Sequence, residues 1–279
     1  MRRWCLGMNK MKWFLSALFV LGCLHEALAS CNFRFDGSDL SDGCFPSQVY
    51  FTDAALTHAQ CTGTIILPNI VLTSAHCTIG WTPTKQTIFI GGGRPNPRRV
   101  YGGERWSRVK EFVKNPGFTE QECMDTKVNY CANDIAIVML TENIYEPEFV
   151  SSPFNALRVK VRNALVAAST PKDGTAVFGA GYGFIEGIQR LRYTDGVLRS
   201  GMQCSDHPDR PSPNYICIDA ASTGGDSGSG FFVRTVGGKK LIGITLVGGG
   251  KMTSFTEVSM YCGFIKTELK KWNIDFECL

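Results

Sequence analysis

The chain has 279 residues and a formal charge of +4, from 29 Lys and Arg against 25 Asp and Glu. Because four of the basic residues and only one acidic residue lie within the first 29, the remainder carries a net charge of only +1. This balance excludes binding to nucleic acid or to an anionic membrane through net charge. About 250 residues are enough for one large core or two small ones.

The first 29 residues have the pattern of a secretory signal peptide. Basic residues precede an apolar run from Trp13 to Leu24, and the small-residue pattern Ala27-Leu28-Ala29 follows. The apolar run is short for a membrane span, which needs about 20 residues, although a signal-anchor is the alternative. We therefore expect cleavage after Ala29, a secreted product and no membrane partner.

The cysteine count agrees with export. Two of the twelve cysteines, Cys5 and Cys23, belong to the signal, and an even number remains. In an exported chain, ten cysteines predict five disulfides. The ten are Cys31, Cys44, Cys61, Cys77, Cys123, Cys131, Cys204, Cys217, Cys262 and Cys278.

Short runs rich in β-branched and aromatic residues, bounded by turn residues, predict strands along most of the chain. They are Ile65–Leu67, Ile70–Thr73, Thr87–Ile90, Asp134–Leu140, Thr175–Phe178, Gly230–Arg234 and Leu241–Val247. Apolar residues at helical spacing predict one amphipathic helix over 261–273. The segment 145–154 has the composition of a linker between two halves. An all-β barrel or sandwich is expected.

Three local motifs carry the chemistry. They are Thr73-Ser74-Ala75-His76-Cys77, Asn133-Asp134-Ile135-Ala136-Ile137 and Gly225-Asp226-Ser227-Gly228-Ser229-Gly230. Each motif by itself is more often structural: a histidine beside a structural cysteine, a turn aspartate, a loop serine. In this order they are specific together.

A serine hydroxyl needs a base to take its proton at neutral pH. Beyond the signal the candidates are His58, His76 and His207, and His76 is the best because it closes an apolar strand beside a cysteine. The imidazole needs a carboxylate to fix its tautomer, and Asp134 enters a strongly apolar strand, where an unpaired charge would be costly. The glycines around Ser227 allow the backbone N–H groups of Gly225 and Ser227 to form an oxyanion hole.

The three motifs and their order resemble those of the chymotrypsin-like serine proteases. The resemblance spans the chain from Phe45-Pro46-Ser47-Gln48-Val49 to the C-terminal helix. It implies two perpendicular six-stranded antiparallel β-barrels, over about 35–145 and 155–260, and a triad of His76, Asp134 and Ser227. The implied reaction is acyl transfer, with no cofactor and no metal; the implied partners are protein or peptide substrates and protein protease inhibitors.

The resemblance also implies two disulfides, Cys61–Cys77 and Cys204–Cys217. Cys123 and Cys131 are close neighbours that could pair, and the other four cysteines allow three connectivities. An alternative is a zinc site formed by His58, Cys61, His76 and Cys77.

Family members are usually made as zymogens, in which a new N-terminus pairs with the aspartate before the nucleophile. That aspartate is Asp226, and the hypothesis is cleavage after Arg34, so that Phe35 supplies the amine and 30–34 form a short propeptide of the protease domain 35–279. Phe35 and Asp36 depart from the family's usual Ile-Val.

The family's primary pocket has its basal residue six positions before the nucleophile, which here is Ala221. Ser222, Gly248 and Thr253 are expected to line the same pocket. These residues predict cleavage after small or medium uncharged residues. The pocket disulfide is missing because Thr223 replaces a cysteine, so a register slip that brings Asp219 into the pocket stays open.

Leu246-Val247-Gly248 stands where the family usually has Ser-Trp-Gly, whose serine bonds the catalytic aspartate. Leu246 has no hydroxyl, which predicts lower activity or an unusual substrate. The sequence therefore predicts a secreted serine endopeptidase. The alternatives are an inactive homologue that acts by binding or inhibition, and a purely structural disulfide-rich β protein.

Overall fold

A computed structural model of the chain describes residues 45, 47–52, 59–83, 87–90, 105–124, 131–144, 163–185, 188–189, 191–200, 204, 215–249 and 252–279. The chain divides into two compact units, residues 1–33 and 34–279, and every described residue belongs to the second. The expected signal and propeptide, Arg34, Phe35, His58 and His207 lie outside the described residues.

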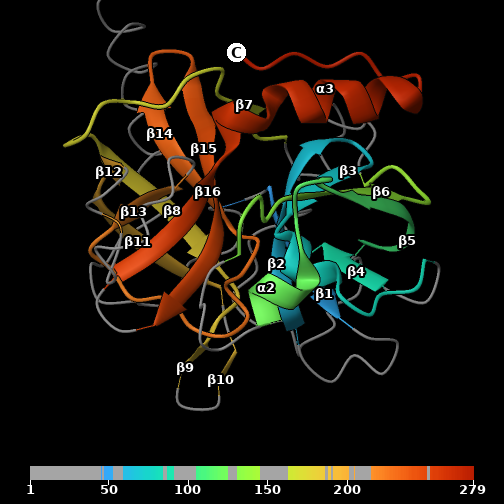
Figure 1. The fold of residues 1–279 in the computed structure, drawn as a ribbon, viewed down its shortest axis with the longest axis horizontal. Coiled ribbons are helices and arrows are strands. Elements are labelled where there is room, and N and C mark those ends of the chain that lie inside the picture. Colours follow the sequence, from blue (N-terminus) through green and yellow to red (C-terminus); the bar gives the residue numbers. More distant parts are fainter. Residues whose placement is uncertain are drawn as a thin grey trace, which may run out of the picture. The chain divides into compact units, whose positions relative to one another are not determined.

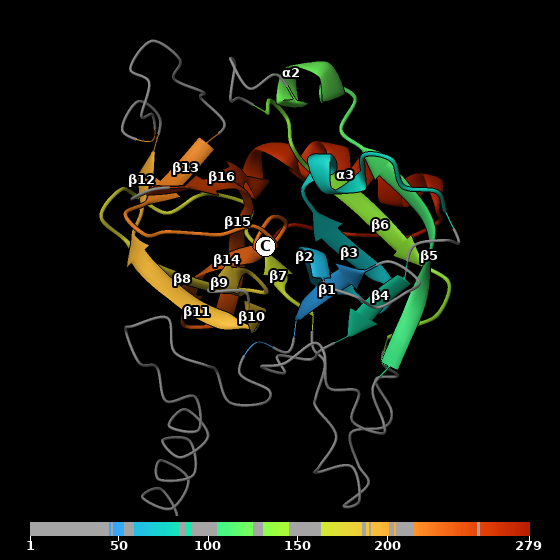
Figure 2. The same cartoon turned by 90° about the horizontal axis from the view of Figure 1, so that it is seen from below.

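The first half forms a closed barrel of six antiparallel strands, drawn in blue to green in Figures 1 and 2. The order is β1-β2-β3-β6-β5-β4, and β4 pairs back onto β1. The strands are β1 (Gln48–Thr52), β2 (Ala59–Leu67), β3 (Ile70–Thr73), β4 (Thr87–Ile90), β5 (Arg105–Lys114) and β6 (Ala136–Leu140). Closure buries an apolar interior that includes Val49, Phe51, Ile65, Val71 and Val138.

The second half forms a sheet with the order β11-β8-β14-β15-β16-β13-β12, and β7 pairs with β15. Its strands are β7 (Leu165–Val166), β8 (Ala176–Gly181), β11 (Arg192–Val197), β12 (Arg199–Ser200), β13 (Tyr215–Ile218), β14 (Gly230–Thr235), β15 (Gly238–Gly249) and β16 (Met252–Glu257). A separate hairpin joins β9 (Phe184–Ile185) to β10 (Ile188–Gln189). Against the six strands expected, the sheet has eight, because the two-residue strands β7 and β12 extend it.

Helices are few in the described ranges. They are the 3₁₀ turns η1 (Ala75–Thr78) and η5 (Val258–Tyr261), and the α-helices α2 (Glu120–Met124) and α3 (Cys262–Lys271). The expected C-terminal helix corresponds to α3, which buries Ile265 and Leu269 and is tied to the chain end by the Cys262–Cys278 disulfide. No helix in these ranges is long and apolar enough to cross a membrane.

The expected all-β fold with a C-terminal helix is confirmed, in the form of two mainly antiparallel sheets of which the first closes into a barrel. The strands β1–β6 fall within 48–140 and β7–β16 within 165–257. Predicted strands were often too short: Ile65–Leu67 is the end of β2, and Leu241–Val247 is the middle of β15.

Candidate active site

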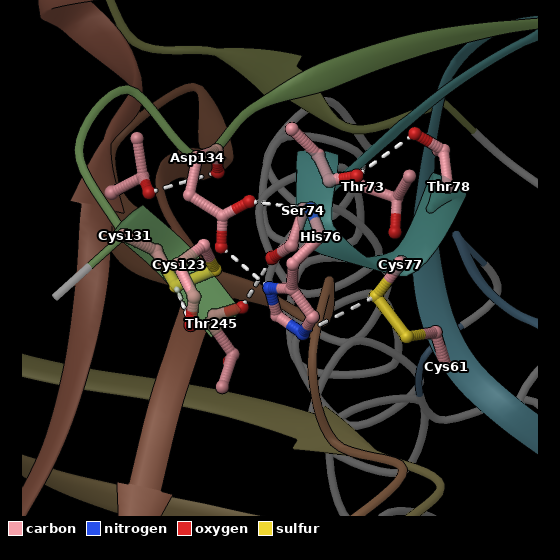
Figure 3. A network of polar contacts seen from close by, with 12 residues as sticks. Cys61, Thr73, Ser74, His76, Cys77, Thr78, Cys123, Cys131, Asp134 and Thr245 are labelled. Atoms are coloured by element: carbon pink, nitrogen blue, oxygen red, sulfur yellow. Dashed lines mark hydrogen bonds and ion pairs between the residues drawn. A yellow bond between two sulfur atoms is a disulfide. The ribbon is translucent and has the colours of Figure 1, made fainter. Parts of the chain in front are cut away.

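His76 and Asp134 are joined by two hydrogen bonds (Figure 3). The imidazole Nδ1 lies 2.6 Å from Asp134 Oδ2, and the backbone N–H of His76 donates to Oδ1 at 2.7 Å. The Asp134 side chain is fully buried, whereas a quarter of the His76 side chain is exposed. A carboxylate at Nδ1 favours the tautomer whose Nε2 carries the lone pair, which is the form that a general base requires.

The position of Asp134 is set by the residue before it. Asn133 adopts a left-handed backbone with φ of +55°, a conformation that asparagine tolerates better than most residues. Its side-chain amide donates to the Gly117 carbonyl at 3.0 Å and accepts from the Tyr261 hydroxyl at 3.1 Å. The Thr256 hydroxyl holds the Asp134 carbonyl at 3.0 Å. Tyr261 and Thr256 come from the second half of the chain, so the carboxylate is fixed by both halves.

His76 lies in the short turn η1, directly after β3. The Ser74 hydroxyl donates to the Thr245 carbonyl at 2.6 Å, which fastens this turn to β15 of the second half (Figure 3). The Cys61–Cys77 disulfide ties the turn to β2. Nε2 of His76 lies 3.7 Å from the Cys77 sulfur. The histidine backbone is therefore restrained from three directions.

A second disulfide, Cys123–Cys131, lies beside the imidazole (Figure 3). A nitrogen of His76 and these two sulfur atoms all lie within 4.8 Å of one another. The Tyr215 hydroxyl donates to the Cys131 carbonyl at 2.5 Å, which ties this loop to the second half. Because the four sulfur atoms around His76 are joined in disulfides, they are not the thiolates that zinc requires.

Ser227 lies in the turn before β14, and this loop contacts the histidine turn. Gly228 has a φ of +84°, and a Cβ built on it would meet Thr62 O and Thr73 Oγ1 at 2.1 Å and Ser74 N at 3.2 Å. Only glycine fits at position 228. This close contact joins the residue that follows Ser227 to Ser74, which lies two residues before His76. Within the described residues no hydrogen bond joins the Ser227 hydroxyl to His76, a contact that often tightens only when substrate binds.

The backbone around Ser227 has two available donors. Among the described residues, the amides of Gly225 and Ser227 donate to no other group, whereas the neighbouring amides of Asp226 and Gly228 bond the carbonyls of Thr223 and Thr245. Gly225 has a φ of +98°, which an L side chain rarely adopts. Free N–H groups of this kind can stabilise a developing negative charge.

Asp226 is enclosed by the chain. Its Oδ2 accepts from the Thr223 backbone N–H at 2.9 Å, and a Cβ on Gly181 or Gly183 would overlap its carboxylate. Burial raises the pKa of Asp226, while hydrogen bonds from Thr223 and Gly183 and the charge of Arg192 oppose that rise. The site that the hypothesis assigns to a new N-terminus thus already has internal donors and a cation close by.

A cavity of about 370 Å³ opens beside the serine loop. The cavity is lined by three of the residues expected in the primary pocket, Ala221, Ser222 and Thr253. Three charged residues also line it: Asp195, Asp219 and Arg192. The Thr253 hydroxyl donates to the Ala220 carbonyl at 2.6 Å. Asp219 pairs with Arg199. Gly248 pairs with Thr253 between β15 and β16.

Leu246 is buried at an irregularity of the β15–β16 pairing. Both carboxylate oxygens of Asp134 are bonded to His76. The second half of the chain bonds the backbone carbonyl of Asp134, through the Thr256 hydroxyl.

Thr62 and Arg192 lie around the site although no motif in the sequence indicated them. Asn133 belongs to the Asp134 motif, but its contacts with Gly117 and Tyr261 were not expected. The only signal for Thr62 in the sequence is that it follows Cys61.

Comparison with known proteins identifies the family of the chain. The sequence profile of the trypsin family matches residues 35–266. The chain is also similar to a protein described as trypsin from Sarcophaga bullata, with 29% identity over 148 residues. That match covers 53% of this chain and 48% of the relative, so the chain spans about half the length of the curated relative it matches. With the family profile covering most of the chain and both barrels, the chain belongs to the trypsin family of serine proteases.

Proposed function

We propose that this chain is a secreted serine endopeptidase in which Ser227 is the nucleophile, His76 the general base and Asp134 the residue that orients the base. The observation that carries the proposal is the double hydrogen bond from His76 to the buried carboxylate of Asp134. A buried carboxylate gains most from a partner that can become positively charged, which is what the imidazole does when it takes a proton.

The reaction would proceed in two acyl-transfer steps. The Ser227 oxygen attacks the scissile carbonyl while its proton passes to Nε2 of His76. The tetrahedral intermediate then breaks its C–N bond, and the imidazolium gives that proton to the leaving amine. Water attacks the acyl-enzyme by the same route, which releases the acid and restores the Ser227 hydroxyl. No redox step, cofactor or metal is needed for this balance.

The oxyanion of the tetrahedral intermediate would be bound by the amides of Gly225 and Ser227. Support comes from their lack of other hydrogen-bond acceptors among the described residues and from the positive φ of Gly225. Removing one such donor typically costs about 10²- to 10³-fold in kcat.

The cavity beside this loop would bind the side chain that precedes the scissile bond. We expect small or medium uncharged residues there, because Ala221 brings no charge and Thr253 occupies space on the cavity wall. The pairing of Asp219 with Arg199 reduces its availability to a basic substrate side chain. A strict preference for Lys or Arg in a peptide library would reject this assignment in favour of Asp219.

The proposal includes export and activation. Four disulfides among the described residues, including Cys204–Cys217, favour an oxidising compartment. Cleavage after Arg34 would release the amine of Phe35 for Asp226, and the family match begins at residue 35. Sequencing the N-terminus of the active protein tests this site, and a start at Ser30 would reject it.

A fluorophosphonate probe, which reacts with an activated serine, tests the proposed function. Labelling of the wild-type protein at Ser227, with no labelling of Ser227→Ala or His76→Ala, is the expected result. The inactive, partner-binding homologue is the alternative, and a folded protein that resists the probe even after cleavage at Arg34 would support it.

A further inference from the structure

Thr62, on β2 of the first barrel, is bonded through every polar atom it has. Its backbone N–H donates to the Ser227 carbonyl at 2.8 Å, and its hydroxyl donates to the Gly225 carbonyl at 2.8 Å. The same hydroxyl accepts from the Tyr182 N–H at 3.0 Å. The Thr62 carbonyl accepts from the Thr73 hydroxyl at 2.9 Å. Thr62 is fully buried, so water does not compete for these bonds.

The two residues that Thr62 holds are those whose amides would form the oxyanion hole. A carbonyl and an amide of one residue are separated only by its φ and ψ, so fixing the carbonyl limits where the amide can point. The restraint matters most at Gly225, because glycine adopts positive and negative φ about equally well. Without the Thr62 hydroxyl, several orientations of the Gly225 amide become accessible.

We propose that Thr62 is a positioning residue for the oxyanion hole, acting through its side-chain hydroxyl. This inference rests on the proposed function of the Ser227 site. It assigns a role in the site to a residue of the first barrel. The hydroxyl of Thr62 is bonded to Gly225 and Tyr182, which lie 163 and 120 positions away in the sequence.

A threonine that merely fills a barrel core would form its bonds within its own sheet. Thr64, two residues along the same strand and equally buried, does this: its hydroxyl bonds the Gln48 side chain of β1. Thr62 instead directs its hydroxyl to two loops of the second half. The comparison separates a packing role from a positioning role within one strand.

Thr62 also connects the oxyanion loop to the base. It directly follows Cys61, whose disulfide partner Cys77 directly follows His76. A single short segment of β2 thus holds the carbonyls of Gly225 and Ser227 on one side and restrains the histidine turn on the other.

The test compares three variants. Thr62→Val keeps the shape and removes the hydroxyl, Thr62→Ser keeps the hydroxyl, and Thr64→Val is the matched control on the same strand. We expect Thr62→Val to lower kcat by about 10- to 100-fold, the size of effect that a small misplacement of catalytic groups produces, with KM changed by less than about 3-fold. Thr62→Ser should restore kcat to within about 3-fold of wild type, whereas Thr64→Val should lower stability and leave kcat within about 3-fold.

A second readout uses a peptide boronic acid, whose tetrahedral adduct with the serine places an oxygen in the oxyanion hole. Its affinity for Thr62→Val should fall in parallel with kcat, while the affinity of an uncleaved product peptide should be unchanged. Thr62→Ala, which removes the hydroxyl without adding a methyl group, serves if the valine variant does not fold.

The inference would be overturned if the Thr62 variant that lacks the hydroxyl, Thr62→Val or Thr62→Ala, had the same kcat as Thr64→Val. The proposed function would remain intact in that case. A loss confined to KM would overturn it as well. A folded wild-type protein that neither hydrolyses peptides nor reacts at Ser227 would overturn the proposed function, and the inference with it.

Discussion

Asp134 accepts two hydrogen bonds from one residue, because its Oδ2 faces the His76 imidazole at 2.6 Å and its Oδ1 the His76 backbone N–H at 2.7 Å. The carboxylate thus fixes both the ring and the backbone of the histidine. No hydroxyl reaches this carboxylate from position 246, because the residue there is the buried Leu246. Activity should therefore depend strongly on the carboxylate of Asp134.

Replacing Asp134 by Asn should abolish most of the activity and leave the fold intact. The amide offers one acceptor in place of two, and an NH₂ group facing Nδ1 favours the wrong imidazole tautomer. The same change in the family's template triad lowers kcat by about 10⁴-fold, and we carry that magnitude over. Steady-state hydrolysis of a peptide substrate measures it, with the exposed Asp275→Asn as control. Retention of more than a tenth of the wild-type kcat would contradict the assigned role.

The wall residue Thr253 should limit the size of the side chain that the cavity accepts. Its hydroxyl is held by the Ala220 carbonyl at 2.6 Å, and its side chain is buried. We expect Thr253→Gly to raise the preference for Leu or Phe over Ala before the scissile bond by about 10- to 100-fold in kcat/KM, since such pockets discriminate by about that factor per carbon group. Thr253→Ser, which keeps the hydroxyl, is the control. An unchanged ratio would mean that this cavity does not bind that side chain.

Two disulfides that close loops of equal length should differ in their effect on activity, because only one of them lies beside the candidate active site. Cys61–Cys77 and Cys262–Cys278 each join residues 16 positions apart, so the loop-closure contribution of each is about 3 kcal/mol. Replacing either pair by alanines should therefore cost similar stability in urea denaturation. Only the Cys61→Ala/Cys77→Ala protein should also lose kcat, because its disulfide restrains the turn that carries His76. An equal kcat in both proteins would contradict that link.

Lys239 should make stability depend on alkaline pH. Its amine lies 4.7 Å from the centre of the Phe45 ring, and burial, with a smaller effect of Arg234, lowers its pKa from 10.5 to about 8. Between these two values the unfolded chain binds more protons than the folded one, so the free energy of unfolding should rise with pH over that window.

The measurement is urea denaturation at several pH values between 7 and 11 for wild type and Lys239→Met. The wild-type protein should gain stability relative to the variant from about pH 8 to pH 10.5. Lys270→Met, an exposed lysine whose pKa is instead raised by Asp275, is the control and should show no such gain. Parallel curves for wild type and Lys239→Met would refute the burial of this amine.

The strands that the sequence identified are those whose composition alone is apolar. Ile70–Thr73 appears unchanged as β3, because all four residues are buried. β5 escaped prediction because Arg105–Lys114 carries charged residues, several of them exposed on the outside of the barrel. β16 escaped because Met252–Glu257 is rich in Ser and Thr, although three of its residues are buried, with Thr253 and Thr256 forming hydrogen bonds. Such strands depend on pairing partners that lie far away in sequence.

The same distinction applies to the candidate site. His76, Asp134 and Ser227 stand out in the sequence because each lies in a local pattern of a few residues. Thr62 does not stand out, since a threonine in a strand is ordinary until its hydroxyl is found bonded to Gly225. Asn133, Tyr261 and Thr256 likewise acquire their importance only through contacts that join the two halves.

By itself, the sequence determined the fold class and the family, and it supplied the candidates for the chemically active residues, because short-range residue patterns encode strand composition, glycine turns and the order of the motifs. The tertiary structure alone decided which residues hold those groups in place. Hydrogen bonds such as those of Thr62 and Asn133 depend on the closure of one barrel and the docking of the second sheet, and neither can be read from neighbours along the chain.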